Sequence, residues 1–141
     1  MLLFRPRRSL AATAAAVMSL AVAAAIPVRP SPAIAGPLAP YYTAAQAAQG
    51  ARLYAVNCSR CHGVDLLGTS APPLVGPTFR RRWPIRTLYR FASRQMPADS
   101  RGSLSPATYS AILAFLLQRN GHPAGAEPLT AARASTITAT L

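Results

Sequence analysis

The stretch Cys58-Ser59-Arg60-Cys61-His62 decides how the rest of the chain is interpreted. It places two thiols three positions apart and an imidazole directly after the second thiol. Cys58 and Cys61 are the only cysteines among the 141 residues, so any chemistry that needs a pair of sulfur atoms has to use both of them. The spacing therefore predicts a site in which two thiols and His62 act together on a single group.

This spacing is typical of covalent attachment of a c-type haem. Each thiol can add to one vinyl group of the porphyrin, and the next side chain is then held under the macrocycle, where an imidazole nitrogen can bind iron. Fewer intervening residues would strain the two thioether links, and a histidine farther along the chain would lose the iron axis. The motif predicts one haem c, covalent through Cys58 and Cys61, with His62 as an axial ligand.

Three other uses of the two cysteines fit the sequence less well. A dithiol redox motif of the thioredoxin type would follow a strand and begin a helix, and no strand-rich pattern surrounds Cys58. A structural zinc site needs four ligands, and the chain has no second Cys/His pair. A simple disulfide is compatible with an exported protein, but it would give His62 and Gly63 no role.

The first 35 residues have the features of an export signal. Three arginines precede an uncharged run over residues 10–26, and Ala33-Ile34-Ala35 is a small-residue cleavage motif. An uncleaved membrane anchor is the alternative, but a run of 17 residues is at the short limit for a spanning helix and prolines follow it. We therefore expect cleavage after Ala35, a periplasmic protein, and a linker over residues 36–42.

Every basic residue of the chain is an arginine, and fifteen arginines against three acidic residues give a formal net charge of +12. Four of them precede residue 36, so eleven would remain after cleavage. Six arginines cluster in the second half of the chain: Arg80, Arg81, Arg82, Arg86, Arg90 and Arg94. This cluster is either a solvated face or a positive surface that attracts an acidic partner. A nucleic-acid surface fits less well because the protein is expected to be exported.

Three segments have the pattern of amphipathic helices. The first begins at Thr43, which forms a capping-box pattern with Gln46, and continues to about residue 56. The second covers residues 85 to about 94 and stops before Met96-Pro97, because the residue before a proline avoids helical geometry. Its inward side chains are expected to be Leu88, Phe91 and Ala92. The third has Ser105 as its N-cap and ends at Asn120-Gly121.

Two segments lack such a pattern. Residues 63–83 are punctuated by glycine and proline, so we expect a loop wrapped around something rather than a second domain. Residues 122–141 hold small and polar side chains without a capped periodic pattern, which predicts a flexible C-terminal tail. Gly50 in the middle of the first helix costs about 1 kcal/mol relative to alanine, which indicates that the last helix crosses closely there.

Met96 is the second candidate for a functional residue. Met1 and Met18 lie in the expected export signal, so Met96 would be the only methionine of the mature chain. A thioether is a suitable sixth ligand for haem iron and raises the reduction potential. A lone methionine usually fills a core, but Met96 sits after a helix, next to Pro97, and off the apolar stripes. His122 is the other candidate for the sixth ligand.

Several landmarks in a fixed order resemble those of the class I, mono-haem cytochromes c. They cover about residues 43–121 and are Gly50-x-x-x-Tyr54-x-x-x-Cys58-x-x-Cys61-His62-Gly63, Pro72-x-Leu74-x-Gly76, Met96-Pro97 and Ala114-Phe115-Leu116. The resemblance implies an all-α class I cytochrome c fold over residues 43–121, in which the first and last helices cross and loops wrap around one covalent haem c.

The resemblance also implies roles for individual residues. His62 and Met96 would be the axial ligands, and the carbonyl group of Pro72 would accept a hydrogen bond from the His62 ring. Leu74 would pack on the macrocycle, and Trp83 would line the haem edge or reach a propionate.

Two further stretches, Met96-Pro97-Ala98 leading to Ser105 and Asn120-Gly121-His122-Pro123-Ala124-Gly125, resemble small periplasmic cytochromes associated with quinoprotein (PQQ-dependent) dehydrogenases.

The implied function is transfer of single electrons between redox proteins, without catalysis on a substrate. A dehydrogenase, such as a quinoprotein alcohol dehydrogenase, would be the donor, and an oxidase or another cytochrome would be the acceptor, with the protein free or a subunit of such a complex. The alternative is a ligand-binding or peroxidase-like c-type haem protein in which Met96 is displaced. A third interpretation is a dithiol redox protein without haem.

Overall fold

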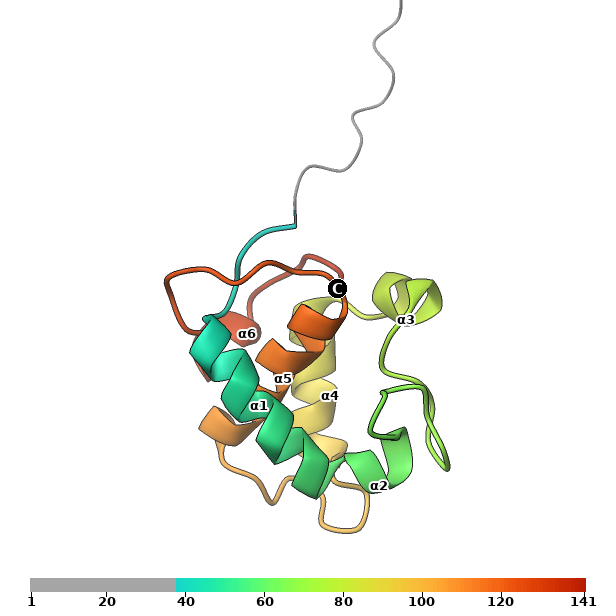
Figure 1. Ribbon diagram of the computed structural model, residues 1–141. Coiled ribbons are helices and arrows are strands. Elements are labelled where there is room, and N and C mark those ends of the chain that lie inside the picture. The colour runs from blue at the N-terminus through green and yellow to red at the C-terminus, as the bar shows by residue number, and fades with distance from the viewer. Residues whose placement is uncertain (1–37) are drawn as a thin grey trace, which may run out of the picture. The chain divides into compact units, whose positions relative to one another are not determined.

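The structure is a computed structural model that describes residues 38–141, and the regular secondary structure of these residues consists of helices joined by loops, with one isolated bridge between Pro84 and Thr140. Two long helices, α1 (Ala44–Asn57) and α5 (Pro106–Arg119), cross at the centre (Figure 1). The all-α prediction is confirmed. No helix within the described part is long and apolar enough to cross a membrane. The expected export signal, residues 1–35, and the start of the linker lie outside it.

The crossing of α1 and α5 depends on Gly50. A Cβ atom at this position would lie 1.8 Å from the carbonyl oxygen of Ala111 and 3.1 Å from the Cβ of Phe115. No other residue therefore lets the two backbones approach this closely. One turn farther along α1, the ring of Tyr54 packs against that of Phe115 with a centroid separation of 5.3 Å. The helix crossing that Gly50 predicted is present.

Both long helices begin at the residues that the sequence predicted. The side chain of Thr43 accepts a hydrogen bond from the amide of Gln46 at 3.2 Å, and that of Ser105 accepts one from the amide of Thr108 at 3.1 Å. Each bond satisfies one amide that the first turn of a helix leaves without an intrahelical partner.

The segment expected to be a continuous loop contains a helix. A short helix α2 (Ser59–His62) follows α1, and a loop over residues 63–76 then leads to α3 (Pro77–Arg82). The prediction of loop geometry throughout residues 63–83 is thus wrong for its last part. Proline is favoured at the first helical position, and Gly76 supplies the positive φ of 100° just before it. Six residues are too few to give a periodic pattern.

Helix α4 (Ile85–Gln95) buries a different set of side chains from the predicted one. Ile85, Leu88 and Tyr89 are buried, whereas Phe91 is 41% exposed. Positions 85, 88 and 89 follow the i, i+3, i+4 spacing of one helix face, and Phe91 lies beside that face. The predicted stop holds, because α4 ends directly before Met96.

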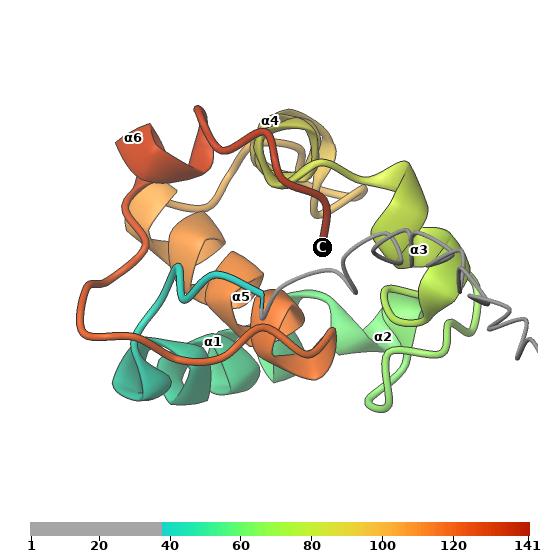
Figure 2. The ribbon, with the colours of Figure 1, turned by 90° about the horizontal axis from the view of Figure 1, so that it is seen from above.

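The prediction of a flexible C-terminal tail is wrong, because residues 122–141 pack on the helices. This segment contains α6 (Ala131–Ala134) and buries Leu129, Ala134 and Leu141. Figure 2 shows the chain running from α6 past α4 to its C-terminus. There the carbonyl groups of Ala139 and Ile137 accept hydrogen bonds from the amides of Ile85 and Arg86, at 2.8 and 3.0 Å, and so cap the start of α4.

Candidate haem-binding site

The two cysteines and the histidine of the central motif lie on one turn of helix. The amides of Cys61 and His62 donate to the carbonyl group of Cys58 at 3.2 and 3.0 Å. Residues at positions i, i+3 and i+4 of such a turn share one face, so both sulfur atoms and the imidazole can address the same group. Both thiols are free and half-buried.

The environment of Cys58 argues against a dithiol redox motif. Burial, together with the neighbouring Cys61, raises the pKa of the Cys58 thiol to about 11. In dithiol oxidoreductases the attacking cysteine has a lowered pKa, because the thiolate is the nucleophile. At neutral pH the Cys58 thiol is almost fully protonated. The structure also shows no strand before this turn within the described part of the chain.

The ring of His62 is held by one hydrogen bond. Its Nδ1 lies 2.8 Å from the carbonyl oxygen of Pro72, the contact that the resemblance to class I cytochromes c implied. A carbonyl group only accepts, so Nδ1 carries the proton and Nε2 keeps the lone pair that a metal ligand needs. The loop that carries Pro72 is tied back to the motif, because the amides of Thr69 and Ala71 both donate to the carbonyl group of Cys61 at 3.0 Å.

Leu74 precedes α3 in the chain and Trp83 directly follows it, and both are half-buried. The amide of Leu74 donates to the carbonyl group of Leu66 at 2.8 Å, and its side chain packs against the core. The ring of Trp83 packs against Phe91 at a centroid separation of 5.3 Å, and the Arg82 guanidinium group lies 5.9 Å from the Trp83 ring centroid. Phe91 thus extends the aromatic surface of Trp83. Sequence reasoning missed this role, because it placed Phe91 in the core.

Met96 directly follows α4, and its backbone is fixed on both sides. Its amide donates to Ala92 at 3.0 Å, and its carbonyl group accepts a hydrogen bond from the Tyr109 hydroxyl group at 2.6 Å. An ion pair of 2.5 Å between Arg60 and Asp99 joins α2 to the loop after Met96. Both partners are exposed, so this pair stabilises the fold little. It shows, however, that the His62 and Met96 segments lie side by side.

His122 does not lie with these residues. It is 4% exposed, its Nδ1 lies 3.3 Å from the carbonyl oxygen of Ala39, and its ring packs against Tyr41 with a centroid separation of 5.7 Å. The side chain is therefore enclosed between α5 and the residues that precede α1. This placement favours Met96 over His122 as the residue available for a sixth ligand.

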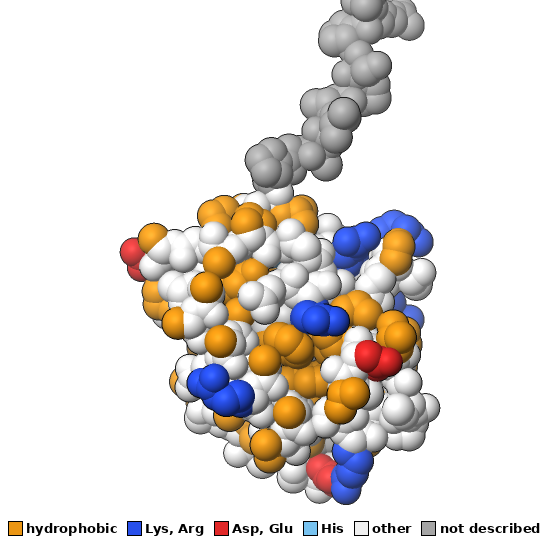
Figure 3. Space-filling model, viewed as in Figure 1, with side chains coloured by type: hydrophobic (Ala, Val, Ile, Leu, Met, Phe, Trp, Pro, Cys, Tyr) orange, Lys and Arg blue, Asp and Glu red, His pale blue; other side chains and the backbone are white. Residues whose placement is uncertain are grey.

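The donors brought together here fit a covalently bound haem. Two free thiols, an imidazole with an oriented ring, and a thioether in the neighbouring segment are the set that a c-type haem uses. Figure 3 shows hydrophobic side chains gathered in the middle of the face between α5 and α3, which suits an apolar macrocycle. Within residues 38–141, no three side chains among His, Cys, Asp and Glu lie close enough together to hold a metal ion. The donor set does not fit a structural zinc site.

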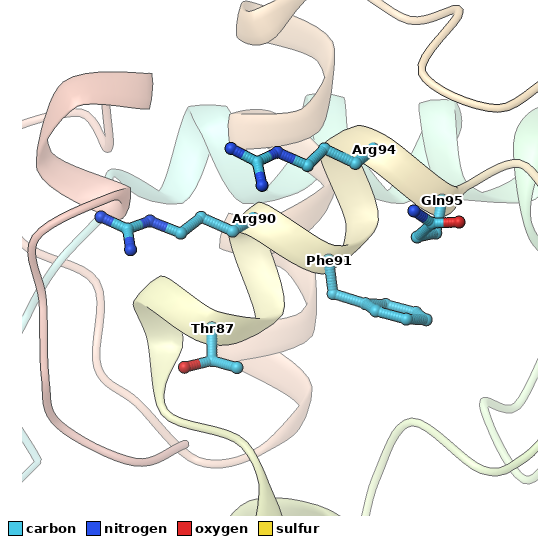
Figure 4. Close-up of a pocket in the computed structure, with 5 residues that line it drawn as sticks. All are labelled: Thr87, Arg90, Phe91, Arg94 and Gln95. Carbon is cyan, nitrogen blue, oxygen red and sulfur yellow. The ribbon is translucent and has the colours of Figure 1, made fainter.

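A cavity of about 350 Å³ along α4 is a separate feature. It is lined by Thr87, Arg90, Phe91, Arg94 and Gln95 (Figure 4). The figure shows Phe91 pointing away from the two arginines. The lining contains no sulfur atom and no imidazole, so we place the candidate site on the ligand-bearing segments rather than in this cavity.

Comparisons with known proteins agree with this placement. The protein-family model described as Cytochrome C oxidase, cbb3-type, subunit III matches residues 45–116, a range that includes the Cys58–His62 motif and Met96. The solved structure described as the sulfane dehydrogenase SoxCD from Paracoccus pantotrophus is similar, with 28% sequence identity and a TM-score of 0.55. That match covers 72% of this chain and 59% of the other, so this chain spans less than two thirds of the matched protein. No curated protein matches the sequence.

Proposed function

The chain belongs to the family described as Cytochrome C oxidase, cbb3-type, subunit III, and from this membership we propose that it is a periplasmic electron carrier with one covalent haem c and His62/Met96 ligation. Membership accounts for the class I cytochrome c fold and for electron transfer through haem c. The ligand set is supported above all by the His62 ring, whose hydrogen bond to Pro72 at 2.8 Å leaves Nε2 for the iron.

Each predicted residue has a defined task in this proposal. Cys58 and Cys61 would hold the haem through two thioether links, and His62 and Met96 would ligate its iron. Pro72 would orient His62, while Leu74 and Trp83 would pack on the macrocycle and keep water away from it. When bound, the haem supplies an iron centre that accepts or donates one electron. With His62 and Met96 both ligating the iron, no site would be open for a substrate, which favours a carrier over an enzyme.

The partners in this proposal are redox proteins on both sides. A dehydrogenase is the proposed donor, because the chain is similar to a solved structure described as a sulfane dehydrogenase. An oxidase or another cytochrome is the proposed acceptor, because the matching family is described as an oxidase subunit. The features of residues 1–35 support export, and thioether formation outside the cytoplasm requires it.

Covalent attachment is tested by producing the full chain together with a cytochrome maturation system. The purified protein is run on a denaturing gel that is stained for haem. We expect a haem-positive band for the natural sequence, a weaker band for Cys58→Ser or Cys61→Ser, and none for the double variant. A colourless natural protein with two titratable thiols would overturn the proposal in favour of a dithiol redox protein.

The second candidate function, a ligand-binding or peroxidase-like haem protein, differs in the state of Met96. It would show covalent haem with a high-spin ferric spectrum and rapid binding of cyanide or carbon monoxide. The position of Met96 next to the His62 segment, joined to it by the Arg60–Asp99 pair, favours the electron carrier.

A further inference from the structure

Three buried tyrosines in this fold each donate a hydrogen bond to a backbone carbonyl group. Tyr42 donates to His122 at 2.5 Å, Tyr54 to Gly63 at 2.7 Å, and Tyr109 to Met96 at 2.6 Å. All three side chains are at most 5% exposed. Two of the three acceptors lie at the proposed iron ligands, since Gly63 directly follows His62 and the third acceptor is Met96 itself.

The Tyr54 and Tyr109 contacts are built in the same way. The carbonyl group of Gly63 also accepts a bond from the amide of Leu66 at 3.2 Å, and that of Met96 also accepts one from the amide of Gly102 at 3.2 Å. In each case one donor belongs to the loop itself and the other is a tyrosine on a long helix. The loop bond shapes the loop, and the tyrosine attaches it to the helix pair.

Packing alone does not require these hydroxyl groups. A phenylalanine would fill nearly the same space, and a buried hydroxyl group destabilises a fold unless it finds a partner. Tyr54 lies on α1 and Tyr109 on α5, the two helices whose backbones meet at Gly50. Each helix of this pair therefore contacts one of the two ligand segments, α1 through Tyr54 and α5 through Tyr109.

We propose that Tyr54 and Tyr109 are positioning residues that set the two axial ligands of the haem, Tyr54 through Gly63 next to His62 and Tyr109 through Met96. This inference rests on the proposed function. The Tyr109 hydroxyl group keeps Met96 at a fixed distance from α5 and so opposes its departure from the iron. The Tyr54 hydroxyl group holds the end of α2, and with it the base of the His62 side chain.

The chain supplies a matched control for the test. Tyr42→Phe removes a buried hydroxyl group that also donates to a carbonyl group, but the acceptor is His122, away from the proposed ligands. Tyr54→Phe and Tyr109→Phe also remove one buried hydroxyl group each and keep the rings, including the contact between Tyr54 and Phe115. The Tyr109 hydroxyl group additionally accepts a hydrogen bond from the amide of Leu104 at 3.3 Å, so Tyr109→Phe should lose somewhat more stability in thermal unfolding than the other two variants.

Two measurements on the haem-containing protein separate positioning from packing. Binding of imidazole to the ferric protein reports how readily Met96 is displaced, and the reduction potential reports the ligand field of both ligands. We expect Tyr109→Phe to bind imidazole about fivefold more tightly, the population change that one ordinary hydrogen bond produces. Tyr54→Phe should shift the potential and leave imidazole affinity unchanged, and Tyr42→Phe should change neither.

The inference would be overturned if none of the three variants differed from the natural protein in imidazole affinity or potential. It would also be overturned if all three variants changed these quantities by the same amount. If a phenylalanine variant does not fold, amide hydrogen exchange in the natural protein replaces it. The amides of Leu66 and Gly102 should then exchange at least as slowly as the amides of α1, and faster exchange would contradict attachment to the helix pair. A natural protein without haem would instead refute the proposed function itself, so the two failures are distinguishable.

Discussion

His62 and Met96 are held in different ways, and the difference determines what a substitution does at each. The His62 ring is oriented through its own side chain, by the bond from Nδ1 to Pro72. Met96 is fixed only through backbone groups, its amide to Ala92 and its carbonyl group to Tyr109. Alanine keeps both backbone groups, so Met96 can be replaced without releasing the segment that carries it.

Met96→Ala should therefore keep the fold and the covalent haem but lower the reduction potential. Thioether ligation raises the potential, and the iron would lose that ligand. Redox titration of the purified variant against the natural protein measures the change. Leu104→Ala, a half-buried residue of the same loop region, serves as the control and should leave the potential almost unchanged. An unchanged potential and spectrum in Met96→Ala would eliminate Met96 as a ligand.

His122 makes the stability of the fold depend on pH. Burial lowers the pKa of His122 below its ordinary value of about 6.5, although contacts with the carbonyl groups of Ala39 and Thr140 oppose this. Between the folded and unfolded pKa values the unfolded chain binds more protons, so the free energy of unfolding rises with pH and falls as the pH drops below about 6.5. The ring of His122 packs against that of Tyr41.

This dependence is measured by urea unfolding of the natural protein and of His122→Gln at several pH values between 5 and 8. The difference between the two proteins should shrink or reverse toward low pH, because glutamine takes up no proton. Comparing the two removes the contribution of the acidic residues, which titrate in both. Parallel curves over the whole range would contradict a neutral, buried His122.

At the scale of single elements, prediction succeeded where one helix carries its own signals. The starts of α1 and α5 could be predicted because the capping residues Thr43 and Ser105 are recognisable in the sequence. Their close crossing could be predicted because it requires a glycine, Gly50, within a helix. It failed for α3, which is too short for periodicity, and for residues 122–141. The buried side chains there, Leu129, Ala134 and Leu141, are spaced irregularly because each fits a different part of the surface.

The candidate site also has residues that the sequence could indicate and contacts that it could not. The motif Cys58–His62 and Met96 could be proposed from the sequence because residue type and spacing suggest their chemistry. The hydrogen bond from Tyr109 to Met96 could not, because a tyrosine on an apolar stripe gives no sign that its hydroxyl group has a specific acceptor. The packing of Phe91 on Trp83 was also missed, since α4 has an apolar face next to that ring.

The packed C-terminal segment predicts that Leu129 contributes to stability as a core residue does. Its side chain is 1% exposed, and its backbone exchanges two hydrogen bonds of 2.8 Å with the side-chain amide of Gln46. Leu129→Ala should lower the free energy of unfolding by about 2–5 kcal/mol. Leu67→Ala, at a residue that is 63% exposed, is the matched control and should change it by less than about 0.5 kcal/mol. Equal effects would mean that residues 122–141 are not packed in solution.

At the scale of the whole molecule, positive charge is unevenly distributed. No acidic residue occurs between Arg80 and Arg94, and five of the six arginines in this segment are exposed. Figure 3 shows arginine side chains gathered over α3. Arg86, Arg90 and Arg94 follow one another at i, i+4 spacing on α4, where like charges repel, so this arrangement does not serve helix stability. It fits an acidic partner that is steered to this side of the protein.

The charge arrangement predicts how the reduced protein reacts with ferricyanide, a trivalent anion. The second-order rate constant should fall as salt is added and should fall further in Arg81→Glu. Arg52→Glu, the same change at an exposed position on α1, should have a smaller effect. A cationic oxidant should show the opposite trends. A rate that does not respond to salt, or equal effects of the two substitutions, would contradict steering by the α3–α4 side.

The central claim is that one covalent haem is held by His62 and Met96 in both oxidation states and so carries single electrons. Absorption spectra of the purified protein, oxidised, reduced, and reduced under carbon monoxide, test it most directly. The account predicts low-spin spectra in both states, the weak ferric band of thioether-to-iron ligation, and no change when carbon monoxide is added. A high-spin ferric spectrum without that band, and prompt carbon monoxide binding, would contradict it and establish an open sixth position.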